Sequence, residues 1–152
     1  MESTDSRIEK ILIIGVGNTL RSDDGIGAYI CLQMDALHLP DVAIRILHQL
    51  QIELIEDVVD YDSVIIADAS VTGADFEFHS VLMDETQALS SSHHLNANML
   101  GALAQKIYGK NIPIFLCSVR GENFEMGEKL SVKAKMNADN AVKMINDWIK
   151  NK

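Results

Sequence analysis

Short apolar runs alternate along the chain with longer segments in which apolar residues recur at helical spacing. Most of these runs are rich in Val, Ile and Leu, which is typical of strands buried on both faces. The alternation predicts an α/β fold with a mostly parallel sheet. The predicted strands cover residues 11–15, 42–47, 64–67, 77–83 and 113–119, and the predicted helices cover about 24–37, 52–61, 95–108 and 131–149.

The predicted helices carry apolar stripes that we interpret as core-facing. Two stripes stand out, one over Leu95, Met99, Leu103 and Ile107 and one over Val132, Met136, Ala141, Met144 and Ile145. The run at 77–83 follows the one at 64–67 too closely for a helical crossover. We therefore predict an edge or antiparallel strand there.

Composition narrows the domain count and the kinds of partner. With 152 residues and 47% hydrophobic content, the chain predicts one domain over 1–152, with residues 1–9 as a flexible tail. A formal net charge of −9 argues against nucleic acid or an anionic membrane as the main partner. No apolar run approaches the ~18 residues of a membrane span, so we expect a cytoplasmic protein. Cys31 and Cys117 lie in apolar runs and are predicted to be buried, which fits a reducing compartment.

The stretch GVGNTLRSDDGIG at residues 15–27 follows the first predicted strand. It lacks the third glycine of a dinucleotide fingerprint, because that position is Leu20. It also lacks the lysine of a P-loop, and its adjacent Asp23 and Asp24 would repel a triphosphate. This loop suits a cation better than a phosphate.

Polar residues from three separate segments are predicted to meet beyond the carboxyl ends of the strands, where open α/β sheets bind ligands. Asp23 and Asp24 follow the first strand, Asp68 ends VIIAD, and His93 and His94 open the third helix. Two carboxylates and an imidazole would form a site for a borderline transition metal, with open positions left for substrate.

Simpler roles remain open for the same residues. Asp23 or Asp24 could cap a helix, Asp68 could cap a turn in ADAS, and the histidine pair could be a solvated helix start. His48, at the end of the second strand, could line the crevice, donate a hydrogen bond there, or be inert.

Two familiar kinds of protease are disfavoured. The chain has no G-x-S-x-G elbow, and its SSS run at 90–92 lacks the setting that activates a serine. It also has no HExxH motif, so it is not a zincin. His38 and His79 are assigned no function.

Four motifs together resemble the [NiFe]-hydrogenase maturation protease family: GVGNTLRSDDGIG, IIADA, HHL opening a helix, and SVRGENFEMGEKLS. They occur in the family's order over nearly the whole chain, and the first is the most specific. Family members are endopeptidases that remove a C-terminal extension from the hydrogenase large subunit after nickel insertion. The resemblance implies a single-domain three-layer sandwich, with a twisted, mostly parallel five-stranded sheet and helices on both faces.

The resemblance also implies site residues. The acidic ligand of the first motif falls on Asp24, which is often glutamate in the family; the mid-chain aspartate falls on Asp68 and the histidine on His93. These three would be both metal-binding and catalytic, in an aspartic-type endopeptidase. A second departure is HQLQIEL at 48–54, where some members have an Asp-Gly-Gly turn. That stretch resembles a subgroup serving cytoplasmic, pyridine-nucleotide-linked hydrogenases.

The nickel would come with the substrate, the immature large subunit, although zinc or cadmium could occupy the site in vitro. No organic cofactor is expected, and we expect a monomer. The metal could polarise the scissile carbonyl or activate water, or one aspartate could be a general base. We expect SVRGENFEMGEKLS to be an ordered loop beside the cleft that contacts the large subunit. The alternative function is a non-catalytic, metal-dependent chaperone or binding module that checks nickel loading.

Overall fold

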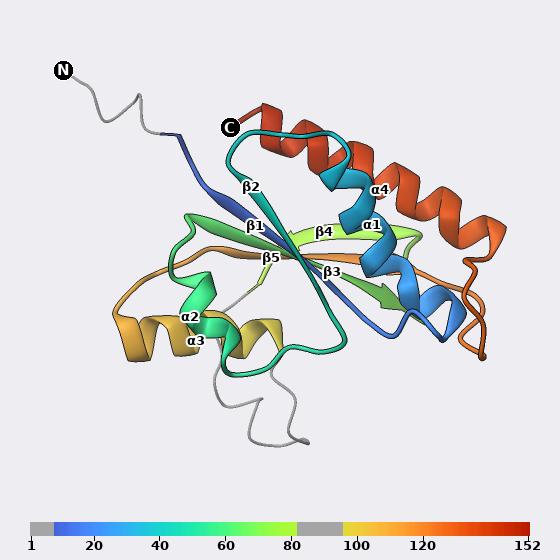
Figure 1. Cartoon of the computed structure of the whole chain (residues 1–152), viewed down its shortest axis with the longest axis horizontal. Coiled ribbons are helices and arrows are strands. Elements are labelled where there is room, and N and C mark those ends of the chain that lie inside the picture. Colours follow the sequence, from blue (N-terminus) through green and yellow to red (C-terminus); the bar gives the residue numbers. More distant parts are fainter. Residues whose placement is uncertain (1–7, 82–95) are drawn as a thin grey trace.

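Five strands form one twisted sheet in a computed structural model that describes residues 8–81 and 96–152 (Figure 1). Their order across the sheet is β2-β1-β3-β5-β4. The first three pairings along this order are parallel, and β4 runs antiparallel to β5 at one edge. The predicted mostly parallel sheet and its antiparallel edge strand are therefore confirmed. The strands are β1 (Ile11–Val16), β2 (Val42–Leu47), β3 (Ser63–Ser70), β4 (Phe76–Ser80) and β5 (Ile114–Arg120).

Helices cover both faces of the sheet, as Figure 1 shows. One face carries α1 (Ile26–Asp35) and α4 (Val132–Lys150), which pack against each other. The other face carries α2 (Leu54–Val58) and α3 (Ala97–Tyr108). A short 3₁₀ turn, η2 (Ser22–Gly25), connects the loop after β1 to α1. The three-layer α/β architecture predicted from the sequence is the one observed.

The apolar strands supply two separate cores because successive side chains point to opposite faces. Ile11 and Ile13 of β1 pack under α1 and α4, whereas Leu12 and Ile14 pack under α2 and α3. All four side chains are at most 3% exposed. Burial on both faces explains why the run ILII has no polar alternation.

The predicted helical stripes were partly wrong. Val132 and Met136 are 81% and 55% exposed, and Ile107 is 56% exposed. The faces that pack on the sheet begin one or two residues later and consist largely of small residues, which allow close approach of helix and sheet. The buried residues are Leu100, Gly101 and Ala104 in α3, and Ala134, Asn137, Ala138, Ala141 and Ile145 in α4.

Other sequence-based expectations have mixed outcomes. Cys31 and Cys117 are buried free thiols, as predicted. No helix in residues 8–81 and 96–152 is long and apolar enough to cross a membrane. The predicted tail over 1–9 lies mostly outside the described residues, as does the end of the strand predicted over 77–83. The first helix is shorter than predicted, since α1 ends at Asp35 and Leu37 is 44% exposed.

Candidate functional site

The glycines of GVGNTLRSDDGIG serve close backbone packing at the carboxyl ends of β1 and β3. Gly17 has φ of +141°, and a Cβ there would lie 2.1 Å from the carbonyl oxygen of Asp24. A Cβ on Gly27 would lie 2.6 Å from the carbonyl oxygen of Ala67. These contacts draw the start of α1 onto the strand ends and bring η2 beside them. The loop therefore places Asp24 close to the end of β3.

Asp68 lies on β3 at the point where the neighbouring strand β1 has ended. The β1–β3 pairing stops at Gly15 and Ala67, whereas β3 continues beside β5 as far as Ser70. Asp68 is thus a strand residue, because β3 ends three residues later than the predicted strand, at Ser70. At the level of Asp68, β3 has no β1 neighbour. Asp68 Oδ1 accepts a 2.8 Å hydrogen bond from the Ala69 N–H.

Asp24 and Asp68 lie close enough together for their charges to interact. Burial raises the pKa of Asp68 from 3.8 to about 6; the hydrogen bond from Ala69 opposes this shift, and the nearby charge of Asp24 adds to it. Asp24 Oδ2 accepts a 2.7 Å hydrogen bond from the Asn18 N–H. Each carboxylate thus has one oxygen held by a backbone donor. The structure brings together the two carboxylates that the sequence placed in one site.

Asp23, the neighbour of Asp24, has a different environment. It is 0% exposed, and its carboxylate accepts hydrogen bonds from the N–H groups of Glu122, Asn123 and Ser131 and from Ser131 Oγ. Burial alone would raise the pKa of Asp23, but these hydrogen bonds together outweigh it and hold the pKa below 3.8. Asp23 is therefore an internal anchor and not a ligand facing the crevice.

Neither aspartate caps a helix, so that simpler role was wrong. The residue before η2 is Arg21 and the residue before α1 is Gly25, and neither position has a side-chain cap. No sequence pattern predicts the contact between Asp23 and Ser131, which are 108 residues apart. The sequence does show Ser131 at the start of the last helix, but no nearby residue indicates that it binds Asp23.

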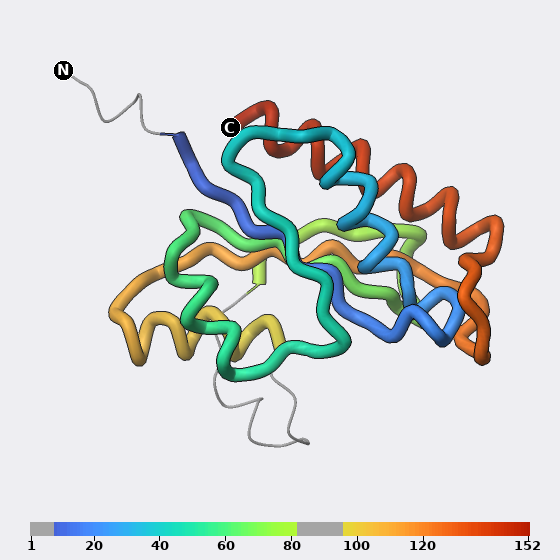
Figure 2. Tube along the Cα trace, viewed as in Figure 1, coloured from blue at the N-terminus to red at the C-terminus, as the bar shows by residue number. Residues whose placement is uncertain are grey.

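Residues 121–131 form an ordered loop beside η2, which we call the 121–131 loop (Figure 2). Ser22 donates from its N–H to the Gly127 carbonyl and from Oγ to the Glu125 carbonyl, both at 2.7 Å. The Gly127 N–H donates in turn to the Leu20 carbonyl at 2.9 Å. The loop is ordered and lies beside η2, as these hydrogen bonds show; its position beside a cleft and its contact with a partner stay predictions.

A pocket of about 310 Å³ opens at the carboxyl end of β2. The Gly17 N–H donates to the Leu47 carbonyl at 3.1 Å, so this pocket adjoins the loop that carries Asp24. His48 lines it and is exposed, in keeping with the predicted lining position. The lining residues are Leu47, His48, Gln49, Gln51, Glu53, Leu54 and Asp57.

His93 and His94 lie outside the described residues. The helix predicted to begin near 95 begins at Ala97, with Asn96 as its N-cap accepting from the Met99 N–H. Among residues 8–81 and 96–152, no group of three His, Cys, Asp or Glu side chains could hold a metal ion. The described part of the site is therefore the pair of Asp24 and Asp68.

Comparisons with solved structures agree with the fold and with the motif. The hydrogenase maturating endopeptidase HybD of Escherichia coli superposes with a TM-score of 0.72 at 25% identity, covering 93% of each chain. An endopeptidase of Escherichia coli is 28% identical, with a TM-score of 0.63 over 90% of this chain and 89% of the other. The [NiFe] hydrogenase maturation protease HycI of Thermococcus kodakarensis KOD1 shares the fold with a TM-score of 0.73 at 22% identity over 95% of each chain.

No protein-family model and no curated protein matches the chain. The structural likeness to HybD nonetheless covers 93% of this chain. Together with the resemblance carried by GVGNTLRSDDGIG, this likeness makes the chain similar to hydrogenase maturation endopeptidases over nearly its whole length.

Proposed function

We propose that the protein is an endopeptidase that removes the C-terminal extension of an immature [NiFe]-hydrogenase large subunit after nickel insertion. The observation that carries this proposal is the closeness of Asp24 and Asp68, whose charges interact near the carboxyl ends of β1 and β3. The endopeptidases that share its fold support the reaction class. In this proposal nickel is part of the substrate.

The donor chemistry of the pair fits nickel carried by another protein. Carboxylate oxygens bind borderline divalent ions, but two of them without a thiolate retain such an ion only weakly. Ligands from the substrate would complete the coordination of its nickel. We assign His93 as the third protease ligand on the strength of the family motif, with Asp24 and Asp68 as the other two. Recognition of the loaded subunit would then depend on the nickel that both proteins share.

The two carboxylates are also suited to proton transfer. A carboxyl group with a pKa of about 6 is mostly ionised at pH 7 yet is more basic than an ordinary aspartate. Asp68 would accept a proton from the attacking water, while the hydrogen bond from the Asn18 N–H orients the carboxylate of Asp24. Burial of Asp68 keeps its carboxylate from being fully solvated, which strengthens its interactions inside the crevice.

The test uses a nickel-loaded large subunit that retains its extension, incubated with purified protein and followed by intact mass. We expect wild type to shorten the loaded subunit and to leave the nickel-free subunit uncut. Asp24→Ala and Asp68→Ala should fold and yet leave the nickel-loaded subunit unprocessed. Asp147→Ala, which removes an exposed acid from α4, should behave as wild type. Unchanged cleavage by both site variants would exclude their assigned roles. Binding without any cleavage by wild type would favour the chaperone function instead.

A further inference from the structure

The buried carboxylate of Asp23 is the central anchor between η2 and the 121–131 loop. Oδ2 accepts from the N–H groups of Glu122 and Asn123 at 2.7 and 2.9 Å and from Ser131 Oγ at 2.7 Å, and Oδ1 accepts from the Ser131 N–H at 2.7 Å. These donors occupy most of the lone-pair positions of an ionised carboxylate. Short, charge-assisted bonds of this kind are stronger than neutral ones and specify one geometry.

The anchor also organises the start of α4. Ser131 is the N-cap of α4, and its Oγ accepts from the Ala134 N–H while donating to Asp23. The backbone of Asp23 adds a further link, because its N–H donates to the Asn123 carbonyl at 2.8 Å. Four separate segments therefore depend on Asp23: η2, both ends of the 121–131 loop, and the first turn of α4.

Asp24 is the next residue along the same turn. In a 3₁₀ turn successive side chains point roughly 120° apart, so an inward Asp23 leaves Asp24 directed away from that anchor. Asp24 is held on its other side by Gly17, which packs against its carbonyl oxygen, and by the Asn18 N–H. Its direction is thus set by the β1 loop on one side and by the Asp23 anchor on the other.

We propose that Asp23 is a positioning residue, which aims Asp24 into the crevice by locking η2 onto the 121–131 loop. It touches no substrate; it acts through the neighbouring backbone. The expected effect of Asp23 on activity rests on the proposed function. The expected effect of Asp23 on the position of Asp24 does not depend on that function. A loosened anchor would let η2 rotate, and a displacement of about 1 Å at a catalytic group costs roughly a hundredfold in rate.

The Asn18 amide is a direct reporter of Asp24. Its 2.7 Å hydrogen bond to Asp24 Oδ2 should give the amide proton a downfield chemical shift and slow exchange with solvent. A change that only lowers global stability would not selectively move this one signal. It therefore distinguishes positioning of Asp24 from a general structural role of Asp23.

Asn137 provides a matched control. It is 2% exposed, and its Nδ2 donates to the Arg120 carbonyl at 3.2 Å, so it is also a buried polar anchor between α4 and the chain just before the 121–131 loop. Among residues 8–81 and 96–152, its side chain forms no hydrogen bond with η2. Asn137→Ala should lower the melting temperature without disturbing Asp24.

The experiment compares Asp23→Asn, Ser131→Ala, Ser131→Thr and Asn137→Ala with wild type. In Asp23→Asn one acceptor becomes an amide donor facing other donors, so we expect Asn18 exchange to accelerate about tenfold and processing to slow about a hundredfold. Ser131→Ala should change Asn18 exchange and processing in the same direction but by less. Ser131→Thr should leave both as in wild type, because threonine keeps the hydroxyl. Asn137→Ala should leave both unchanged.

The inference is overturned if the Asn18 signal of folded Asp23→Asn matches wild type, or if Asn137→Ala moves it equally. Should Asp23→Asn fail to fold, Gly121→Ala tests the same anchor, because a Cβ there would lie 2.7 Å from Asp23 Cβ and displace it. An unperturbed Asn18 signal in Gly121→Ala and Ser131→Ala would also overturn it. If wild type cuts no large subunit, the proposed function fails, while the Asn18 comparison still decides the positioning role.

Discussion

The charge of Asp24 lies close enough to Asp68 to add to the raised pKa that burial imposes on that carboxyl group. The two residues come from different segments, η2 and β3, and Asp68 lies just beyond the point where the β1–β3 pairing stops. Ionised Asp68 is thus held in an environment that favours its neutral form. Such destabilisation is common at functional sites, where stability is lost in favour of reactivity.

Asp68→Asn should therefore stabilise the protein at neutral and alkaline pH. Because the pKa of Asp68 is raised in the folded state from 3.8 to about 6, folding favours the protonated form. The benefit of that form is present below pH 3.8 and lost as pH rises to about 6. Urea unfolding should show the variant more stable than wild type at pH 8, by at most about 3 kcal/mol, with little difference near pH 4. Equal gains at both pH values would contradict the pKa assignment.

The link between Tyr29 and Asp139 predicts a second pH effect, on the α1–α4 face. Tyr29 Oη donates a 2.6 Å hydrogen bond to Asp139, and burial together with this carboxylate raises the pKa of Tyr29 from 10.0 to about 12. Its contribution to stability is present below pH 10 and lost as pH rises toward 12. Tyr29→Phe should cost about 1–2 kcal/mol at pH 7 and flatten the alkaline loss of stability seen in wild type.

Tyr108→Phe is the matched control for that experiment, because Tyr108 is 44% exposed at the end of α3. It should leave both the stability at pH 7 and the alkaline transition unchanged. An alkaline transition in Tyr29→Phe as steep as that of wild type would show that another group titrates there.

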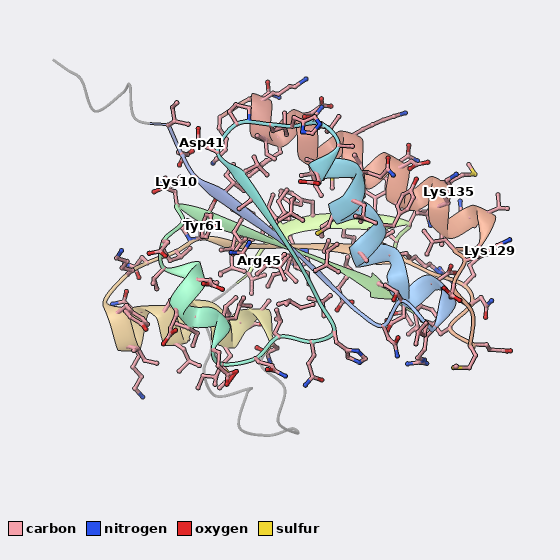
Figure 3. All side chains as sticks on the ribbon, in the orientation of Figure 1. Lys10, Asp41, Arg45, Tyr61, Lys129 and Lys135 are labelled. Atoms are coloured by element: carbon pink, nitrogen blue, oxygen red, sulfur yellow. The ribbon has the colours of Figure 1, made fainter. Side chains whose placement is uncertain are left out.

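The exposed side chains of the 121–131 loop predict a docking effect. Glu122, Glu125 and Glu128 are exposed, and Met126 is 83% exposed on a loop whose backbone is firmly anchored. Lys129, a residue of this loop, lies at the opposite end of the molecule from Lys10 in Figure 3. Changing the three glutamates to alanine should weaken binding of the large subunit about tenfold and reduce its salt dependence, while the rate at saturating substrate stays unchanged.

A control with the same change in net charge replaces three exposed acids elsewhere, Asp35, Asp60 and Asp147, with alanine. It should bind as wild type if the position of the charges matters more than their number. If the triple glutamate variant bound the large subunit as tightly as wild type does, the loop would not contact this partner through its glutamates.

His93 and His94 can be separated by substitution. In the family motif the ligand histidine is the first of HHL, so His93→Ala should lose both nickel binding and processing, whereas His94→Ala should keep both. Calorimetry with nickel or zinc and intact mass of the large subunit provide the measurements. The reverse pattern would reassign the ligand. Leu95, on which the sequence-based argument for His93 rests, lies outside the described residues, whereas Met99 and Leu103 of the same predicted stripe pack against the core.

The amino-acid sequence by itself determined the fold class and the two segments that supply the carboxylates, while the choice of Asp24 over Asp23 came only from the family resemblance. Apolar runs such as ILII and VIIA report burial on both faces of a parallel sheet, because that environment excludes polar side chains at every position of the strand. The spacing of Gly17, Asp24 and Gly27 reflects local backbone packing, which a short motif can record. Because Asp24 follows the first predicted strand and Asp68 ends another, both could be placed near the carboxyl ends of neighbouring strands.

Only the tertiary structure decided the role of Asp23 and the faces of the helices. Asp23 and Asp24 are adjacent and chemically identical, yet one accepts donors from residues 122–131 and the other faces the crevice. That difference arises from contacts about a hundred residues apart, which no local pattern encodes. Likewise, Val132 and Met136 fit a helical stripe as well as Ala134 and Ala138 do, but the close approach of α4 to α1 and the sheet selects the small residues for burial.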